Sequence, residues 1–168
     1  HPEMITDIHY EYLMAGSQIL KTNTFGCNAL KFSLDGEFAL EKLICAAVEN
    51  ARKAILKADK VQGEDAYIAL DLGPTGKLLE PLGDLPFEKA VELYAQVTKI
   101  GVQCGVDCVL IETMNDGYEA KAAVLGVKEN CDLPVFVTTV YDENGKSLTG
   151  SGPKNMVALL EGLGVDAL

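Results

Sequence analysis

The stretch that decides the fold is residues 105–116, Gly-Val-Asp-Cys-Val-Leu-Ile-Glu-Thr-Met-Asn-Asp. The glycine ends a helical segment, and an apolar run then leads to Glu112. A short apolar run between turn signals is typical of a strand buried on both faces, as in a parallel sheet. In a βα barrel the loops at the carboxyl ends of such strands carry the chemistry. Glu112 is therefore the leading functional candidate. Alternatively, it caps the next helix or pairs with a basic residue.

Helix and strand patterns alternate through the rest of the chain. Apolar residues at helical spacing predict helices over residues 2–15, 38–58, 87–103, 116–129 and 153–163, with a polar turn over 62–65. Short apolar runs predict strands over residues 18–23, 66–72, 106–111 and 134–140, and one more that starts at 164–168. Asp84 is the expected N-terminal cap of the third helix. Because no hairpin signal occurs, this order predicts a parallel sheet with right-handed crossovers.

The absence of a nucleotide-binding loop favours a barrel over an open sheet. Doubly wound sheets usually carry a glycine-rich phosphate loop, and Gly-Pro-Thr-Gly at 73–76 does not match one. We therefore expect an α/β fold that is an incomplete (βα)8 TIM barrel with its helices outside. A whole barrel takes about 250 residues. The 168 residues, which start on a helix and end in a strand, are expected to be one domain and an internal piece of such a barrel.

Charge and cysteine content narrow the class of protein. The chain has 25 acidic and 14 basic residues, a net charge of −11 at pH 7, which opposes binding to nucleic acid or anionic membranes. We expect no membrane span and no secretory leader. Five cysteines at irregular spacing predict reduced thiols in a cytoplasmic protein.

Several short blocks follow one another in a specific order. They include Thr-Asn-Thr-Phe-Gly at 22–26, Asp-Leu-Gly-Pro-Thr-Gly at 71–76, Ile-Glu-Thr at 111–113, Glu-Ala-Lys-Ala-Ala at 119–123 and Leu-Thr-Gly at 148–150. With His-Pro-Glu at 1–3 and Gly-Val-Asp at 105–107, they make the chain resemble the homocysteine S-methyltransferase family. The likeness is greatest to the homocysteine-binding barrel of its cobalamin-dependent members. It implies that the chain covers strands two to five and the start of strand six, without the first strand and the C-terminal strands.

The resemblance implies methyl transfer to the thiol of homocysteine, which gives methionine. The family holds one zinc ion through three cysteines, and these are expected outside this chain, which would contain no metal ligand and no catalytic residue. Methylcobalamin is the implied methyl carrier. The implied partners are homocysteine and the cobalamin and folate modules of the full-length protein. An isolated piece with unpaired strand edges is expected to self-associate.

Five residues are the candidates for substrate binding. Glu112 matches the family glutamate that holds the substrate ammonium group. Asn23 and Thr24 match positions at the same mouth, and Asp71 and Thr138 occupy equivalent strand ends. These last two could instead satisfy loop backbone.

The remaining cysteines and histidines are not expected to act in the site. Cys104 and Cys108 are four residues apart but lie at the opposite end of the predicted sheet. Cys27 matches no family ligand, and Cys45 and Cys131 are expected to be packing residues. His9 is expected on the first helix, away from the strand ends, as a packing or surface residue.

Two other functions stay open. One is a different barrel enzyme, such as an aldolase or isomerase, with Glu112 as acid or base. It would need a lysine at a strand end or a phosphate loop, and the nearest lysine, Lys21, is expected inside its strand. The other is a non-catalytic acidic scaffold for a protein partner.

Overall fold

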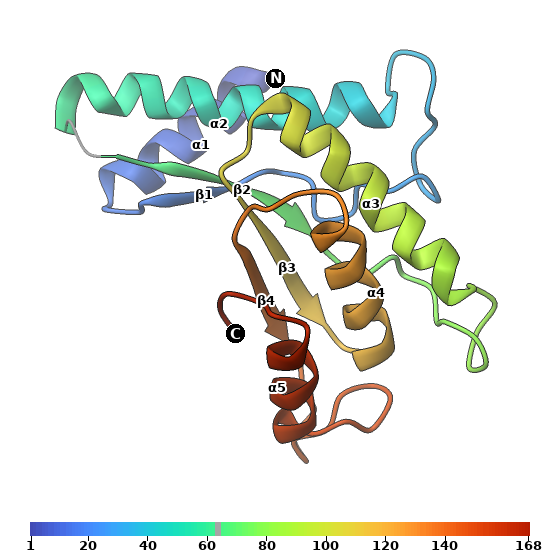
Figure 1. The fold of residues 1–168 in the computed structure, drawn as a ribbon. Coiled ribbons are helices and arrows are strands. Elements are labelled where there is room, and N and C mark those ends of the chain that lie inside the picture. The colour runs from blue at the N-terminus through green and yellow to red at the C-terminus, as the bar shows by residue number, and fades with distance from the viewer. Residues whose placement is uncertain (63–64) are drawn as a thin grey trace.

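The computed structural model describes residues 1–62 and 65–168, which form a parallel α/β sheet with its helices (Figure 1). Among these residues the sheet has four strands in sequence order, and all neighbours are parallel. The strands are β1 (Ile19–Lys21), β2 (Tyr67–Leu72), β3 (Cys108–Met114) and β4 (Val135–Thr139). The helices are α1 (Pro2–Met14), α2 (Leu40–Gln62), α3 (Phe87–Cys104), α4 (Gly117–Lys128) and α5 (Pro153–Gly162). The prediction of parallel strands joined by helices is confirmed.

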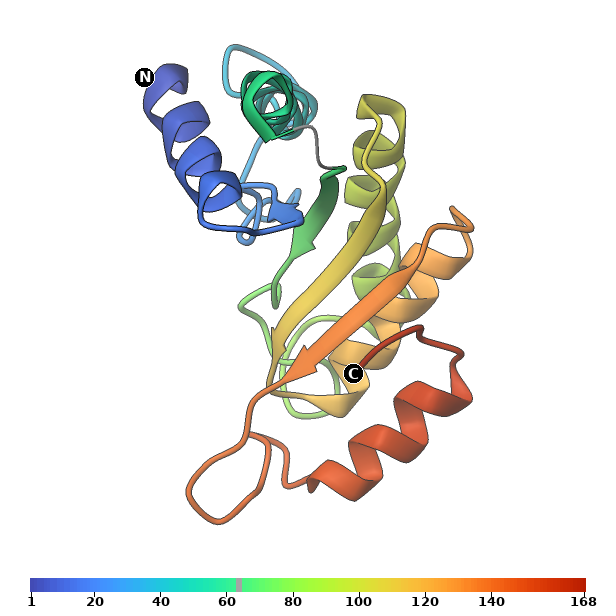
Figure 2. The same cartoon turned by 90° about the vertical axis from the view of Figure 1, so that its left-hand side faces the viewer.

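The helices form a layer outside the sheet (Figure 2). Each packs against the next along the chain, from α1 on α2 to α4 on α5. The strands twist, and α3 and α4 lie along the same side of them (Figure 2). Successive units of a βα barrel have this arrangement, with strands inside and helices outside.

Helix α3 approaches β2 closely at a glycine. A Cβ atom added to Gly101 would lie 2.6 Å from a methyl group of Leu70, which is itself fully buried. Glycine is unfavourable inside a helix, but here it lets helix and strand come together. Gly105 then ends α3 in the left-handed conformation, with φ 86°.

The repeated Gly-Val-Asp sequence forms the same junction twice. Asp107 donates its backbone N–H to Ile68 O (2.8 Å) and accepts the Ile68 N–H on Oδ2 (2.7 Å). Asp166 makes the same two bonds to Val135, at 2.9 and 2.8 Å. Each aspartate therefore fixes the register of its segment on the preceding strand.

Several strands differ from their predicted extents, and β1 covers only Ile19–Lys21 of the predicted residues 18–23. β3 continues to Met114, and its ladder to β4 is irregular between Ile111 and Met114. The expected fifth strand is a single parallel bridge between Ala167 and Phe136.

The helix boundaries also differ. α2 extends beyond the predicted end at residue 58, and Gly63 and Glu64 of the predicted polar turn lie outside the described residues. The prediction that Asp84 caps α3 is wrong. Pro86, with φ −61°, is the N-cap residue, and Asp84 pairs with Lys77 at 3.1 Å.

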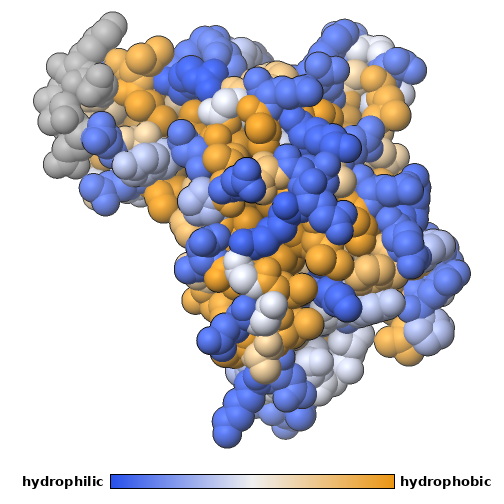
Figure 3. All heavy atoms as spheres, viewed as in Figure 1, coloured by the Kyte–Doolittle hydropathy of each residue, from blue (hydrophilic) through white to orange (hydrophobic). Residues whose placement is uncertain are grey.

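Apolar side chains reach the surface in the middle of the face drawn in Figure 3, with hydrophilic side chains around them. Ile19 and Tyr67, where β1 and β2 begin, are about half exposed. Self-association of an isolated piece stays a prediction. Within the described part of the chain, no helix combines the length and apolarity needed to cross a membrane.

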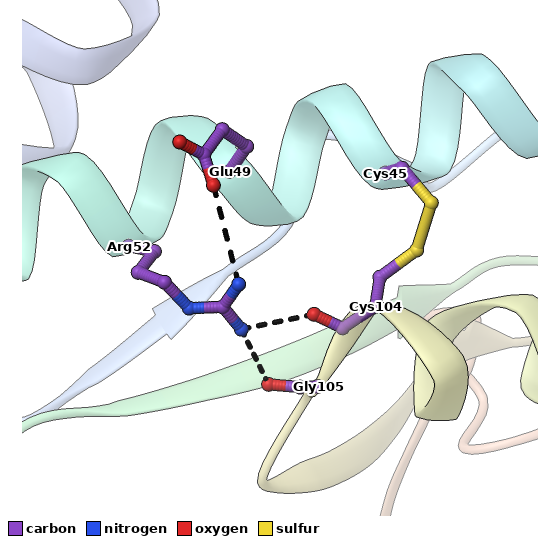
Figure 4. The surroundings of a disulfide bond; sticks show 5 residues. All are labelled: Cys45, Glu49, Arg52, Cys104 and Gly105. Atoms are coloured by element: carbon purple, nitrogen blue, oxygen red, sulfur yellow. Dashed lines mark hydrogen bonds and ion pairs between the residues drawn. A yellow bond between two sulfur atoms is a disulfide. The ribbon is translucent and has the colours of Figure 1, made fainter.

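The prediction that all five cysteines are reduced is wrong. Cys45 of α2 and Cys104 of α3 form a disulfide, with their Cα atoms 5.5 Å apart (Figure 4). Arg52 braces the same helix pair by donating to the carbonyl oxygens of Cys104 (2.9 Å) and Gly105 (3.0 Å). The cytoplasmic location was inferred from reduced cysteines, so the disulfide removes the basis of that inference.

We expect the disulfide to stabilise the fold measurably. Replacing Cys45→Ser opens a covalent loop between residues 59 positions apart and should lower the free energy of unfolding by about 2–4 kcal/mol. Chemical denaturation measures this loss. A reductant should lower the stability of the wild type and leave the variant unchanged. Equal stability of the oxidised wild type and the variant would contradict the expectation.

Candidate functional site

Glu112 lies where the β3–β4 ladder is irregular. The next residue, Thr113, has φ 63°, which is costly for a β-branched side chain. Thr113 donates its backbone N–H to Thr138 Oγ1 at 3.0 Å. Thr138 therefore supports this irregular backbone from β4. Strained backbone that neighbouring groups hold in place is common at functional sites.

Glu112 pairs with a basic residue. Its Oε1 atom accepts a hydrogen bond of 2.6 Å from Lys21 Nζ. Lys21 is the last residue of β1, so the expectation that it lies inside its strand is wrong. The hydrogen bond from Lys21 to Glu112 raises the pKa of the lysine, so its ammonium group stays protonated.

Asp71 is a buried carboxyl group beside this pair. It is only 4% exposed, and its Oδ1 atom has no hydrogen-bond partner among the described residues. Burial first, and then the negative charge of Glu112, raise the pKa of Asp71 to about 7, while the positive charge of Lys21 opposes the change. An unpaired, buried carboxyl oxygen is unfavourable in a structure and common in a binding site.

Two threonines fix the end of β1 against β2. The Oγ1 atoms of Thr22 and Thr24 lie 2.6 Å apart, and both side chains are buried. Thr22 Oγ1 accepts the Asp71 N–H at 2.9 Å, and Thr24 donates to the Asp71 carbonyl oxygen at 2.8 Å. Thr24 therefore positions Asp71 through its backbone, and Thr22, which sequence reasoning missed, does the same.

A cavity of about 520 Å³ lies between α1 and the strand ends. Lys21, Asn23 and Asp71 line one side, and His9 and Tyr12 of α1 line the other. His9, expected to be a packing or a surface residue, is buried, and burial lowers its pKa. It is not remote from the strand ends, because the cavity brings it to the same space as Lys21 and Asp71.

A second buried carboxylate, Glu119, has a structural environment. Its Oε1 atom accepts from Thr75 N (2.7 Å), Thr75 Oγ1 (2.6 Å) and the Tyr94 hydroxyl (3.1 Å). These bonds anchor the turn at 73–76 to α3 and α4. A Cβ atom at Gly73 would also strike the ring of Phe25. The turn is therefore shaped by packing.

The described residues do not fit a zinc site. Among them, no group of three His, Cys, Asp or Glu side chains is placed to hold a metal ion. Cys104 is bonded to Cys45, so it cannot pair with Cys108 as a ligand. Burial raises the pKa of Cys27 and of Cys108, which disfavours the thiolate that zinc binds.

The parallel strands, with charged side chains at their carboxyl ends, place the chain in the βα-barrel class. A profile of the homocysteine S-methyltransferase family matches residues 1–168. The chain belongs to the homocysteine S-methyltransferase family.

Relatives and solved structures agree with this membership. The chain is 32% identical over 174 residues to methionine synthase of Mycobacterium leprae (strain TN), covering 99% of this chain and 14% of that protein. It superposes on the metallated form of the homocysteine methyltransferase MmuM from Escherichia coli with a TM-score of 0.85, at 22% identity, covering 98% of this chain and 60% of that one. For the apo form the TM-score is 0.79, at 20% identity, over 98% and 59% of the two chains. The chain thus spans about three fifths of the length of these barrels.

The pKa of Asp71 predicts how stability depends on pH. Its value in the folded protein, about 7, exceeds the ordinary 3.8, so folding takes up a proton between these values. Stability should therefore fall as pH rises from 3.8 to about 7. Asp71→Asn should remove this part of the slope in thermal denaturation series. Parallel curves for the two proteins would contradict the assignment.

The Glu119 network predicts a different effect. Glu119→Leu leaves the Thr75 N–H and hydroxyl without their acceptor, while the Tyr94 hydroxyl keeps Gly73 O at 3.2 Å. It should cost about 1–3 kcal/mol of unfolding free energy. Glu119→Gln keeps one acceptor oxygen and should cost less. Urea denaturation compares the three proteins, and equal losses in both variants would show that the hydrogen bonds do not carry the effect.

Proposed function

We propose that the chain forms the homocysteine-binding part of an S-methyltransferase of the methionine synthase type, which methylates the homocysteine thiol to give methionine. One observation supports the placement of the homocysteine site at Glu112. At the carboxyl end of the sheet, Glu112 holds an ammonium group, that of Lys21, at 2.6 Å. Family membership and the likeness to a methionine synthase support the reaction type.

Glu112 would bind the ammonium group of homocysteine as it binds that of Lys21. A carboxylate that accepts from an ammonium group makes a short, charge-assisted hydrogen bond. The Glu112 side chain is 19% exposed, so water screens this bond only in part. Asp71 adds a second carboxyl group, and Asn23 lines the cavity beside it.

Thr24 and Thr138 would act through the backbone. Thr24 fixes the carbonyl group of Asp71, and Thr138 fixes the amide that follows Glu112. All five residues predicted from the sequence would thus serve substrate binding, two of them indirectly. This proposal is supported by the hydrogen bonds that connect the carboxyl-terminal ends of the four strands.

The cofactors would be held elsewhere. The thiol of homocysteine, like that of cysteine, has a pKa near 8.5 and needs activation at neutral pH. We propose that zinc supplies this activation and that its cysteine ligands lie outside the described residues, since these do not fit the ion. Methylcobalamin is the proposed methyl carrier, with cobalamin and folate modules as partners in the full-length protein. This chain would hold the amino-acid end of the substrate.

The competing functions have less support. An aldolase that forms a Schiff base needs an unprotonated lysine, and Glu112 keeps Lys21 protonated. In a scaffold without a ligand, nothing would offset the energetic cost of the strained backbone at Thr113 or of the Asp71 oxygen that is unpaired within the described structure. Both features are costly and both lie beside Glu112.

Glu112→Gln tests the proposal in the longest natural polypeptide that contains this chain. Losing one hydrogen bond to a charged group costs about 1.5–3 kcal/mol, so the Michaelis constant for homocysteine should rise about 10- to 100-fold. Zinc content should not change. Glu129→Gln, at the exposed end of α4, is the matched control and should behave as wild type. Unchanged homocysteine binding in Glu112→Gln would refute the site.

A further inference from the structure

Lys21 reaches Glu112 across the sheet. The two residues lie on β1 and β3, with β2 between them. Neighbouring strands are about 4.8 Å apart, so the lysine side chain crosses β2 to reach Glu112. Its register partner on β2 is Ala69. The Lys21 side chain is 48% exposed, so its ammonium group can change partners without disturbing the core.

This cluster has two carboxyl groups and one cation. Lys21 occupies Oε1 of Glu112, and Oδ1 of the buried Asp71 is unpaired within the described chain. Burial and the charge of Glu112 raise the pKa of Asp71 to about 7, which favours a proton on this carboxyl group. A second ammonium group placed here would meet both carboxyl groups and make that proton unnecessary.

We propose that Lys21 binds the α-carboxylate of the amino-acid substrate, while Glu112 and Asp71 bind its ammonium group. This inference rests on the proposed function. The two charged groups of an α-amino acid are attached to the same carbon atom. When the substrate ammonium group takes the place of Lys21 on Glu112, the released lysine is therefore beside the substrate carboxylate.

The exchange keeps the charges of the site balanced. One Lys21–Glu112 ion pair is replaced by two ion pairs, and the zwitterionic substrate brings no net charge. Only a ligand with a carboxylate gives the displaced Lys21 a new ion pair. The lysine therefore makes the site selective for amino acids over simple amines.

The test compares two ligands. L-Homocysteine has a carboxylate, and aminopropanethiol has the same carbon chain, thiol and amine without it. Affinities are measured anaerobically by calorimetry on the longest natural polypeptide that contains the chain. Lys21→Met should weaken homocysteine binding about 10- to 100-fold, the size of one charge-assisted contact. It should leave aminopropanethiol binding unchanged or tighter.

Lys21→Arg is the matched control. It keeps a positive charge at the same place and should retain most of the affinity for homocysteine. Thermal denaturation establishes that each variant is folded. Equal weakening of both ligands by Lys21→Met would overturn the proposal, because the lysine would then only shape the site. Unchanged homocysteine affinity would overturn it as well.

Failure of the proposed function has a different signature. If Glu112 binds the ammonium group, Glu112→Gln weakens both ligands. If the wild type binds neither ligand, the proposed function is wrong and this proposal falls with it. If Glu112→Gln weakens both ligands and Lys21→Met affects neither, only the role of Lys21 is wrong.

Discussion

Register between parallel strands is the constraint on which this structure depends. Two aspartates, Asp107 and Asp166, each exchange two hydrogen bonds with the preceding strand, through the backbone N–H and the side chain. A parallel ladder that slipped would move every inward-facing side chain relative to its neighbours. Because Asp107 fixes the β2–β3 register, Asp71 and Glu112 end up beside each other. The site chemistry therefore depends on hydrogen bonds at the opposite end of the strands.

Two of the buried carboxyl groups, Glu119 and Asp71, differ in their surroundings. Glu119 accepts three hydrogen bonds from Thr75 and Tyr94 and thereby anchors a turn. Asp71 is equally buried, yet one of its oxygens lacks a partner in the described structure, and a second carboxylate lies beside it. A satisfied carboxylate gains nothing from a ligand, whereas an unsatisfied one does. This difference, and not burial itself, is the reason why we propose a binding region at the end of β2.

Helices α2 and α3 support β2 and β3, the strands that carry Asp71 and Glu112. The Cys45–Cys104 disulfide and the two hydrogen bonds of Arg52 tie α2 to the end of α3, where the Gly105 turn leads into β3 (Figure 4). Gly101 lets α3 lie directly on Leu70 of β2. The strands that carry Asp71 and Glu112 are thus held both by their ladder and by the helices. A rigid support of this kind keeps charged side chains at fixed separations, which recognition of a small zwitterion requires.

The sequence by itself determined the alternation of helices and strands, the parallel sheet and the position of Glu112 near the carboxyl end of a strand. These follow from local periodicity and from the topological rules for βα units, which need no knowledge of partners. Only the tertiary structure decided that Lys21, 91 residues away, holds Glu112, that Oδ1 of Asp71 is buried and unpaired among the described residues, and that Cys45 reaches Cys104. It also decided that β3 continues past Glu112 with an irregular ladder. The reason is that strand register and helix packing bring distant residues together, and the hydrogen bonds, charges and burial that follow belong to pairs of segments and not to either segment alone.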